Sequence, residues 1–301
     1  MPPDAWPPLP LAPWKDTYAT LHRWLQIAGK VRLALGPHLN QFWEATYYLT
    51  ASGLTTSVMP LPGDAGVLEL EFDFLSETLL ASTSHGGEAA LPLRPMPVAD
   101  FQRDFDALLH GLDVHVKTWP MPVEIPHPVR FDQDREHASY DPEAVRRWWR
   151  VLVASDRVFQ AFRAEYQGKC SPVHLFWGSL DLAVTRFSGR PAPPRPGADR
   201  ITQEAYSQEV ASVGFWPGND DFPEPAYYAY AAPEPTGFRQ ASLAPATAFY
   251  WETGGEFLLR YDEMRRAGSP DEALLAFCHS SYEAAARLGN WDRNRLELKA
   301  A

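Results

Sequence analysis

The sequence predicts an α+β protein in which helices pack on a mostly antiparallel sheet. Runs of alternating apolar and polar residues follow one another without intervening helices, which favours antiparallel pairing. Long apolar stripes at helical spacing begin each half of the chain, and a further helix follows each group of strands. The pattern therefore predicts two similar halves, residues 1–131 and 132–301, that share one sheet. A single compact unit is the alternative to two domains.

The first half is expected to start with a proline-rich extended arm over residues 1–13. Asp16 is a suitable first residue for a helix that ends near Leu35, because Gly36 and Pro37 follow it. Leu68, Leu70, Phe72 and Phe74 then alternate with acidic residues, as in a strand with one wet face. The expected elements of this half are strands at 46–51, 55–59, 67–75, 78–83, 89–93 and 114–119 and helices at 16–35 and 98–110.

The second half begins after a proline-rich segment over residues 120–141, the best candidate for a boundary. Asp141 and Pro142 are typical of the N-cap and the first turn of a helix. A final helix is expected to begin at Asp271 and to end at Gly289. The expected elements of this half are helices at 142–168, 202–210 and 271–288 and strands at 173–177, 180–186, 212–216, 227–231 and 248–251.

Composition excludes several classes of function. The formal net charge of −11 disfavours a primary role in nucleic-acid binding, because phosphate contacts need a positive field. No apolar run approaches the roughly 20 residues of a membrane span, and the first residues lack the regions of a signal peptide. Two cysteines, Cys170 and Cys278, do not make a disulfide framework and fit a reducing compartment. We therefore expect a cytoplasmic protein with neither nucleic acid nor membrane as partner.

The segment from residue 169 to 190 is the most informative part of the chain. It sets His174, Asp181, Arg186 and Arg190 among apolar residues typical of strands. Ionisable groups are costly in such surroundings unless they are paired, so the segment is either a strand pair with one polar face or the wall of a pocket. Cys170 and Ser171 are nucleophile candidates, but no recognisable signature surrounds Cys170, which is expected to be buried and inert.

A catalytic hypothesis assigns His174 as the acid–base group and Asp181 as the residue that orients it. Arg186 and Arg190 would hold an anionic small molecule, since the guanidinium fork suits carboxylate and phosphate. The alternatives are a structural histidine bonded to Asp181, and arginines that pair with the surplus acids. No metal ligand set is assigned and the cofactor is left open. Four further residues are predicted to line the binding site: Trp177, Glu209, Trp216 and Tyr228.

A polar stripe on the first helix and the carboxylate of Glu124 each have a structural interpretation and a functional one. His22, Gln26 and Lys30 form a polar stripe at four-residue spacing on the first helix, which favours a solvated face over one turned toward a pocket. Glu124 is flanked in the sequence by apolar residues and prolines, and its pKa would rise if it were buried. An exposed loop is the preferred interpretation of Glu124.

Several stretches resemble a bacterial family known only as a domain of unknown function. The resemblance rests on Trp119-Pro-Met-Pro-Val-Glu-Ile-Pro, on Gly214-Phe-Trp-Pro-Gly and above all on residues 171–190, SPVHLFWGSLDLAVTRFSGR. It runs from about residue 6 to 295 and implies no activity, substrate or cofactor. It also implies histidines near positions 41, 44 and 208, where this chain has Gln41, Glu44 and Gln208, so a histidine-rich metal site is not expected.

These observations favour an enzyme acting on a small anionic metabolite, with a pocket made by His174, Asp181 and the two arginines. A non-catalytic protein that binds a small molecule or a partner in an aromatic cleft is the alternative, since the chain has 11 Trp and 12 Tyr residues. A structural or assembly role is a third possibility. The sequence does not identify a reaction or an oligomeric state.

Overall fold

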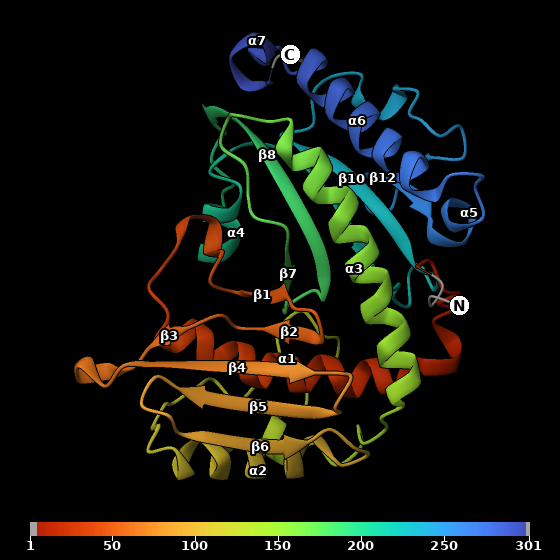
Figure 1. Ribbon diagram of the computed structural model, residues 1–301. Coiled ribbons are helices and arrows are strands. Elements are labelled where there is room, and N and C mark those ends of the chain that lie inside the picture. Colours follow the sequence, from red (N-terminus) through yellow and green to blue (C-terminus); the bar gives the residue numbers. More distant parts are fainter. Residues whose placement is uncertain (1–4, 299–301) are drawn as a thin grey trace.

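The computed structural model describes residues 5–298, apart from the side chain of Asp64. Within this range the chain forms helices packed on an antiparallel sheet of 12 strands, which confirms the predicted α+β class (Figure 1). The helices are α1 (Lys15–Leu35), α2 (Val98–Gly111), α3 (Pro142–Ala164), α4 (Arg200–Ala205), α5 (Tyr261–Arg265), α6 (Pro270–Leu288) and α7 (Arg293–Leu296).

The strands of both halves belong to this one sheet. Its order is β11-β12-β10-β9-β8-β7-β1-β2-β4-β5-β6, with β3 paired to β4. The two groups of strands meet where β1 pairs with β7. The strands are β1 (Thr46–Leu49), β2 (Gly53–Thr55), β3 (Met59–Pro60), β4 (Val67–Asp73), β5 (Thr78–Thr83), β6 (Glu88–Pro92), β7 (His174–Phe176), β8 (Asp181–Pro191), β9 (Gln208–Trp216), β10 (Ala226–Ala232), β11 (Phe249–Trp251) and β12 (Glu256–Arg260).

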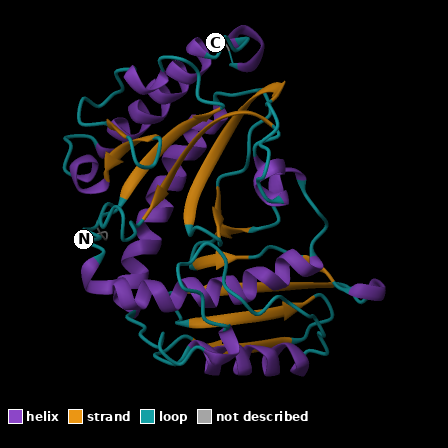
Figure 2. Cartoon of the chain, turned by 180° about the vertical axis from the view of Figure 1, so that it is seen from behind, coloured by secondary structure: helices purple, strands orange, loops and turns teal. Residues whose placement is uncertain are grey.

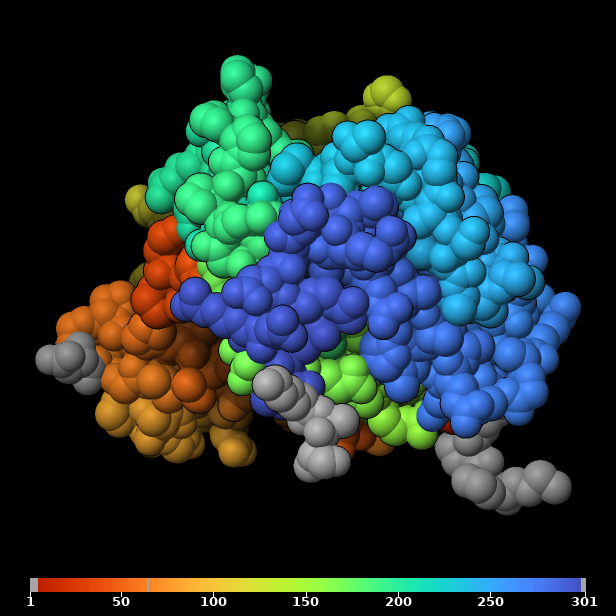
Figure 3. Space-filling view, turned by 90° about the horizontal axis from the view of Figure 1, so that it is seen from above, coloured from red at the N-terminus to blue at the C-terminus, as the bar shows by residue number. Residues whose placement is uncertain are grey.

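Two long helices cover one face of the second group of strands. Helix α3 contacts β8, and α6 contacts β9 and β10; in Figure 1, α3 crosses in front of β10. Figure 2 shows the opposite face of these strands turned toward the viewer, with no long helix across it. We call this opposite face of β8, β9, β10 and β12 the distal face. Seen from above, the C-terminal residues lie between the segments near residues 200 and 240 (Figure 3).

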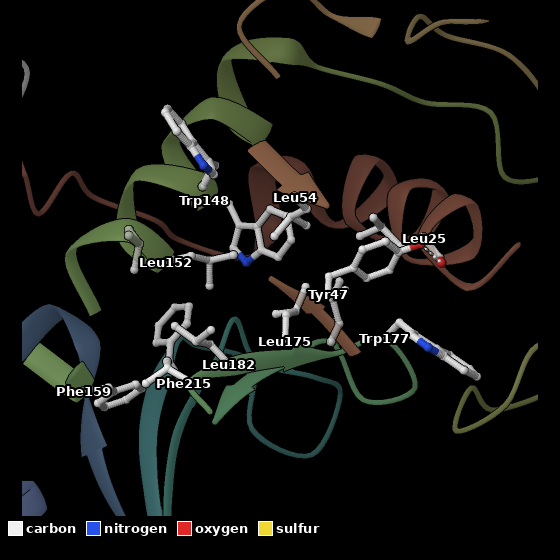
Figure 4. Close-up of a cluster of buried hydrophobic side chains, with 14 of the residues drawn as sticks. Leu25, Tyr47, Leu54, Trp148, Leu152, Phe159, Leu175, Trp177, Leu182 and Phe215 are labelled. Atoms are coloured by element: carbon white, nitrogen blue, oxygen red, sulfur yellow. Dashed lines mark hydrogen bonds between the residues drawn. The ribbon is translucent and has the colours of Figure 1, made fainter. Parts of the chain in front are cut away.

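A continuous core joins the two halves. Leu25 of α1 and Tyr47 of β1 pack in the same cluster as Leu152 of α3, Leu182 of β8 and Phe215 of β9 (Figure 4). Each of these side chains is at most 1% exposed. Burial of apolar area at roughly 25 cal/mol per Å² is the main stabilising term, so this cluster holds the halves against each other.

Local sequence signals explain the best-defined elements. The Asp141 side chain accepts hydrogen bonds from the backbone of Glu143 and Ala144, and Pro142 occupies the first turn of α3, as predicted. On β4, Leu68 and Leu70 are buried while the acidic residues between them are half-buried, which confirms the expected alternation.

Three expectations about elements are wrong. Residues 114–119 form no strand, since pairing needs a neighbouring edge and a local pattern does not encode one. The helix expected at 202–210 ends at Ala205, and β9 begins at Gln208. The strand expected at 55–59 divides into β2 and β3 around Ser57, whose φ of 55° breaks the extended backbone. Among the described residues, no helix is both long and apolar enough to cross a membrane.

Candidate functional site

The candidate site lies on the distal face, where Tyr228 of β10 reaches across β9 to Asp181 at the start of β8. The Tyr228 hydroxyl donates a hydrogen bond to one carboxylate oxygen of Asp181, and the Ser179 hydroxyl donates to the other. In the sheet register, Tyr228 lies opposite Gly214, which lies opposite Ala183. A Cβ at position 214 would come 2.3 Å from the Tyr228 ring, so the absence of a side chain at Gly214 makes room for the ring above β9.

A second carboxyl group lies within electrostatic reach of Asp181. Asp181 is 9% exposed; burial raises its pKa, and the hydrogen bonds from Ser179 and Tyr228 oppose that rise. On β12, burial and then the negative charge of Asp181 raise the pKa of Glu256 to about 7. Neither carboxyl group has an ion-pair partner among residues 5–298. We call Asp181, Ser179, Tyr228 and Glu256 the Asp181 cluster.

Glu124 stands at the rim of this cluster. A Cβ at Gly178 would come 2.5 Å from the nearer carboxylate oxygen of Glu124, so the carboxyl group lies directly over the turn that leads to Asp181. Glu124 is exposed, as predicted; loss of water on its inner side and then the charge of Asp181 raise its pKa. Glu124 and Leu180 have φ of 55° and 59°, a costly left-handed backbone that concentrates at functional sites.

The polar stripe of α1 holds the two loops that carry these groups. His22, Gln26 and Lys30 are at most 6% exposed, so the expectation of a solvated face is wrong. Nε2 of His22 lies 2.9 Å from the carbonyl oxygen of Gly178. The Gln26 amide donates to the carbonyl oxygen of Val123 and accepts from its N–H, both at 2.8 Å. His22 and Gln26 are buried because the loops supply these hydrogen bonds.

Aromatic side chains extend the distal face beyond the cluster. Trp216, a predicted binding residue, packs against Phe222 and Trp251 at centroid distances of 5.7 and 6.5 Å. The Tyr228 and Tyr230 rings stack at 6.0 Å. Trp216, Trp251 and Tyr230 are half-buried, so this surface keeps contact with solvent. Tyr228 and Trp216 therefore share one face, as a common binding site would require.

His174 lies on the same face but is enclosed. It is 1% exposed and its ring contacts Trp43, Tyr48 and Phe176. Burial, followed by nearby arginines, lowers the pKa of His174 to about 3, so the ring is neutral at neutral pH. No hydrogen bond joins His174 to Asp181 in the described part of the chain, because Phe176 and not His174 is the residue opposite Asp181. A catalytic role for His174 stays a prediction.

Arg186 points to the other side of the sheet. Its guanidinium carbon lies 3.5 Å from the Phe162 ring centroid and 4.4 and 4.9 Å from those of Tyr282 and Tyr166. It also donates to the carbonyl oxygen of Phe162 and is 2% exposed. Strand alternation separates it from Asp181, so the structure does not bring these two predicted residues together.

Arg190 and Glu209 pair with each other, 2.6 Å apart, at the end of α6. Arg190 also donates to the carbonyl oxygens of Gly289 and Asn290. Glu209 and Trp291 line a cavity of about 170 Å³ there. This arrangement fits the alternative in which the arginines pair with acids, and it separates both residues from the Asp181 cluster.

Trp177, the remaining predicted binding residue, packs on α1. A Cβ at Gly29 would come within 2.6 Å of its ring, and the ring is 4% exposed. Its side chain lies at the border of the core and points away from the central cluster (Figure 4). Trp177 therefore belongs to a different surface from Tyr228 and Trp216.

Sequence reasoning missed the part of the site that comes from β12. No strand was expected after Trp251, so Glu256 was not considered. The signal was present, because Gly254-Gly255 between apolar residues is typical of a hairpin turn. Ser179 lies in the turn before β8, and its hydroxyl donates a hydrogen bond to Asp181.

The cluster combines groups that hold or move a proton. Two carboxyl groups with raised pKa values lie beside a phenol, and no cation within residues 5–298 pairs with them, which favours a positively charged or hydrogen-bonding ligand. Within the part of the chain that the structure describes, no group of three or more His, Cys, Asp and Glu residues is arranged to hold a metal ion.

Comparison with known proteins identifies a family but no activity. Residues 6–298 match the model of a family of unknown function, DUF5996. No curated protein and no solved structure matches the chain.

Proposed function

We propose that this chain, which belongs to the DUF5996 family, is an enzyme that binds a small amine-bearing metabolite at the Asp181 cluster and transfers a proton there. The observation that carries the proposal is the Tyr228–Asp181 hydrogen bond across Gly214, with Glu256 close enough for its pKa to respond to Asp181. Perturbed carboxyl groups with a specific partner are typical of functional sites.

Charge sets the class of ligand. Asp181 and Glu256 lack ion-pair partners among residues 5–298, and Glu124 at the rim adds a third acid. An ammonium group would replace the missing cation and relieve the repulsion between the acids. The expected anionic ligand finds less support here, because Arg186 and Arg190 are engaged elsewhere.

The aromatic part of the distal face suits the rest of such a ligand. Trp216, Trp251 and Tyr230 are half-buried beside Tyr228, and tryptophan and tyrosine faces attract cations and apolar chains. A ligand with an amine at one end and an apolar or aromatic body would contact both parts of the face.

Proton transfer follows from the two carboxyl groups. A group with a pKa near 7 exists in both protonation states at neutral pH, which suits a general acid or base. Glu256 has this property because burial and the charge of Asp181 raise its pKa to about 7. In this scheme the Asp181 carboxylate accepts a hydrogen bond from the ligand ammonium, and Tyr228 holds that carboxylate in place. Glu256 accepts a proton from the ligand or donates one to it.

The test is a panel of ligands that have matched bodies and different charges. Benzylamine, benzyl alcohol and benzoate have similar bodies and differ in charge, and each is titrated in a thermal-shift experiment. We expect benzylamine to raise the melting temperature saturably and benzoate to have no effect. A larger response to benzoate would overturn the assignment of charge.

Two variants on one hairpin separate the site from its surroundings. Glu256→Gln removes the acid of the cluster, whereas Glu252→Gln removes an acid whose side chain is 75% exposed. The benzylamine response should fall in the first variant and persist in the second. Equal responses would show that the amine binds elsewhere.

A non-catalytic binding protein is the second candidate, favoured by the half-buried Trp216 and Trp251. The two functions differ in what happens to the bound amine. Mass spectrometry of an amine metabolite mixture after incubation should show one component converted by the native chain and left intact by Glu256→Gln. Binding without conversion would favour the second candidate.

A further inference from the structure

We propose that Lys30 is a reactive amine that forms an imine with a small aldehyde or ketone. The site is made by Lys30 and Trp177, on the part of α1 that follows Gln26. It does not depend on the function proposed for the Asp181 cluster, because neither residue belongs to that cluster.

Lys30 is buried without an anionic partner within residues 5–298. The residue is 6% exposed, and its Nζ makes no hydrogen bond or ion pair within residues 5–298. Nζ lies 5.4 Å from the centroid of the Trp177 ring, whose face attracts a cation. Lysines are almost never fully buried unless they are paired, so this position has a cost that a function would explain.

A second unpartnered donor lies beside it. Nε1 of Trp177 is enclosed and has no hydrogen-bond partner in the described part of the chain. The five-membered part of that ring packs on Gly29, the residue before Lys30, where a Cβ would come within 2.8 Å of Nε1. Two donors without acceptors therefore meet at one place on α1, which is what a ligand with an acceptor oxygen would complete.

The other lysines provide an internal comparison. The chain has five: Lys15, Lys30, Lys117, Lys169 and Lys299, the last of which lies outside the described residues. Lys15 pairs with Asp220, and Lys169 donates to Gln41 at 2.6 Å. Lys117 is exposed. Within residues 5–298, Lys30 is thus the buried lysine whose amine makes no hydrogen bond or ion pair.

The same burial prepares the amine for reaction. Burial lowers the pKa of Lys30 to about 8, so at neutral pH the uncharged, nucleophilic fraction exceeds that of an ordinary lysine by on the order of a hundredfold. Nζ of Lys30 keeps a small contact with solvent, unlike the fully enclosed Nε1 of Trp177.

The chemistry balances without an oxidant or a cofactor. The Nζ lone pair attacks the carbonyl carbon and gives a carbinolamine, whose hydroxyl leaves with a proton as water. Nitrogen gives up two hydrogens, the carbonyl oxygen leaves in the water molecule, and a carbon–nitrogen double bond remains. The Trp177 N–H supplies a donor for the oxygen while it is negatively polarised.

The experiment traps the imine in the intact protein. The full chain is incubated near neutral pH with acetaldehyde and cyanoborohydride, and peptide mass spectrometry follows ethylation of each lysine. Lys30 should react at least about tenfold faster than Lys117, and glyoxylate should show whether the site accepts a negatively charged aldehyde. Labelling of Lys30 no faster than Lys117 would overturn the proposal.

Two controls link the result to the fold. In denaturant the rates at Lys30 and Lys117 should become equal, because the advantage comes from the native surroundings. Trp177→Phe keeps the aromatic face and removes the N–H, so it should slow labelling of Lys30 and leave that of Lys117 unchanged. A Lys30 advantage that survives denaturation would contradict the assignment.

Discussion

The Gln26 side chain holds the backbone of Val123 at both its donor and its acceptor, with two hydrogen bonds of 2.8 Å. Helix α1 thereby fixes the loop that carries Glu124, whose carboxyl group lies over Gly178. A buried helix residue therefore positions a loop that has no regular structure of its own.

Gln26→Leu tests this link. Leucine keeps the volume but leaves the Val123 N–H and carbonyl unpaired, which costs roughly 1–3 kcal/mol for each buried group. We expect a lower free energy of unfolding in urea and faster amide exchange at Val123. The matched control is Gln102→Leu on α2, whose amide donates a hydrogen bond to the exposed Asp106 side chain. Equal stability of the two variants would show that the clamp contributes nothing.

Gly214→Ala should separate Tyr228 from Asp181. The added Cβ would meet the Tyr228 ring at 2.3 Å, and overpacking of this kind costs about 1–3 kcal/mol. With the ring displaced, Asp181 loses one donor to its charged form, so its pKa should rise further. Carboxyl-region infrared titration or NMR of Asp181 measures this, with Gly111→Ala, where a Cβ meets nothing within 4 Å, as control. An unchanged titration would contradict the role given to Gly214.

Lys30→Met should stabilise the protein at neutral pH. The pKa of Lys30 is about 8 in the folded chain and 10.5 in the unfolded chain. Below pH 10.5 the unfolded chain therefore holds the Lys30 proton more tightly than the folded chain does, which lowers the free energy of unfolding. That cost, up to about 3 kcal/mol at neutral pH, fades as the pH rises from 8 to 10.5. Urea unfolding should show a gain for Lys30→Met at pH 7 that shrinks toward pH 10.5. Lys117→Met, at an exposed position, should change little.

Acid should weaken the fold through two buried histidines. Burial lowers the pKa of His22 to about 4 and that of His174 to about 3, from 6.5. As the pH falls, both histidines are protonated in the unfolded chain near pH 6.5 but in the folded chain only near pH 4 and pH 3. Their contribution to the free energy of unfolding is therefore fully present above pH 6.5 and is lost as the pH falls toward 4 and 3. Chemical unfolding across this window should show the loss. His174→Phe should reduce it, and an unchanged slope would contradict the neutral, enclosed state of His174.

The elements with local signals could be predicted from the sequence. Asp141 and Pro142 begin α3, and the alternation of β4 appears directly in its residues. The missing pieces depend on distant partners. Residues 114–119 look like a strand but have no edge to pair with, and β12 was overlooked although Gly254 and Gly255 mark its hairpin.

The site was predictable as a segment but not as a set of side chains. Asp181, Tyr228 and Trp216 were identified and lie on one face, whereas Arg186 lies on the other because strand neighbours alternate. The odd spacing of five residues between Asp181 and Arg186 already indicates opposite faces once both are assigned to one strand. The buried stripe of α1 was misjudged, since its hydrogen-bond partners at Val123 and Gly178 are remote in sequence.

Calorimetric titration of benzylamine into the native chain and into Asp181→Asn measures whether the Asp181 charge binds a cation. Asparagine keeps the shape and a hydrogen-bond acceptor for Tyr228 but removes the negative charge. We expect saturable binding to the native chain that weakens at least about tenfold in the variant, which is about 1.4 kcal/mol. Equal affinity of the two proteins, or no binding of the amine to either, would contradict a cation site at Asp181.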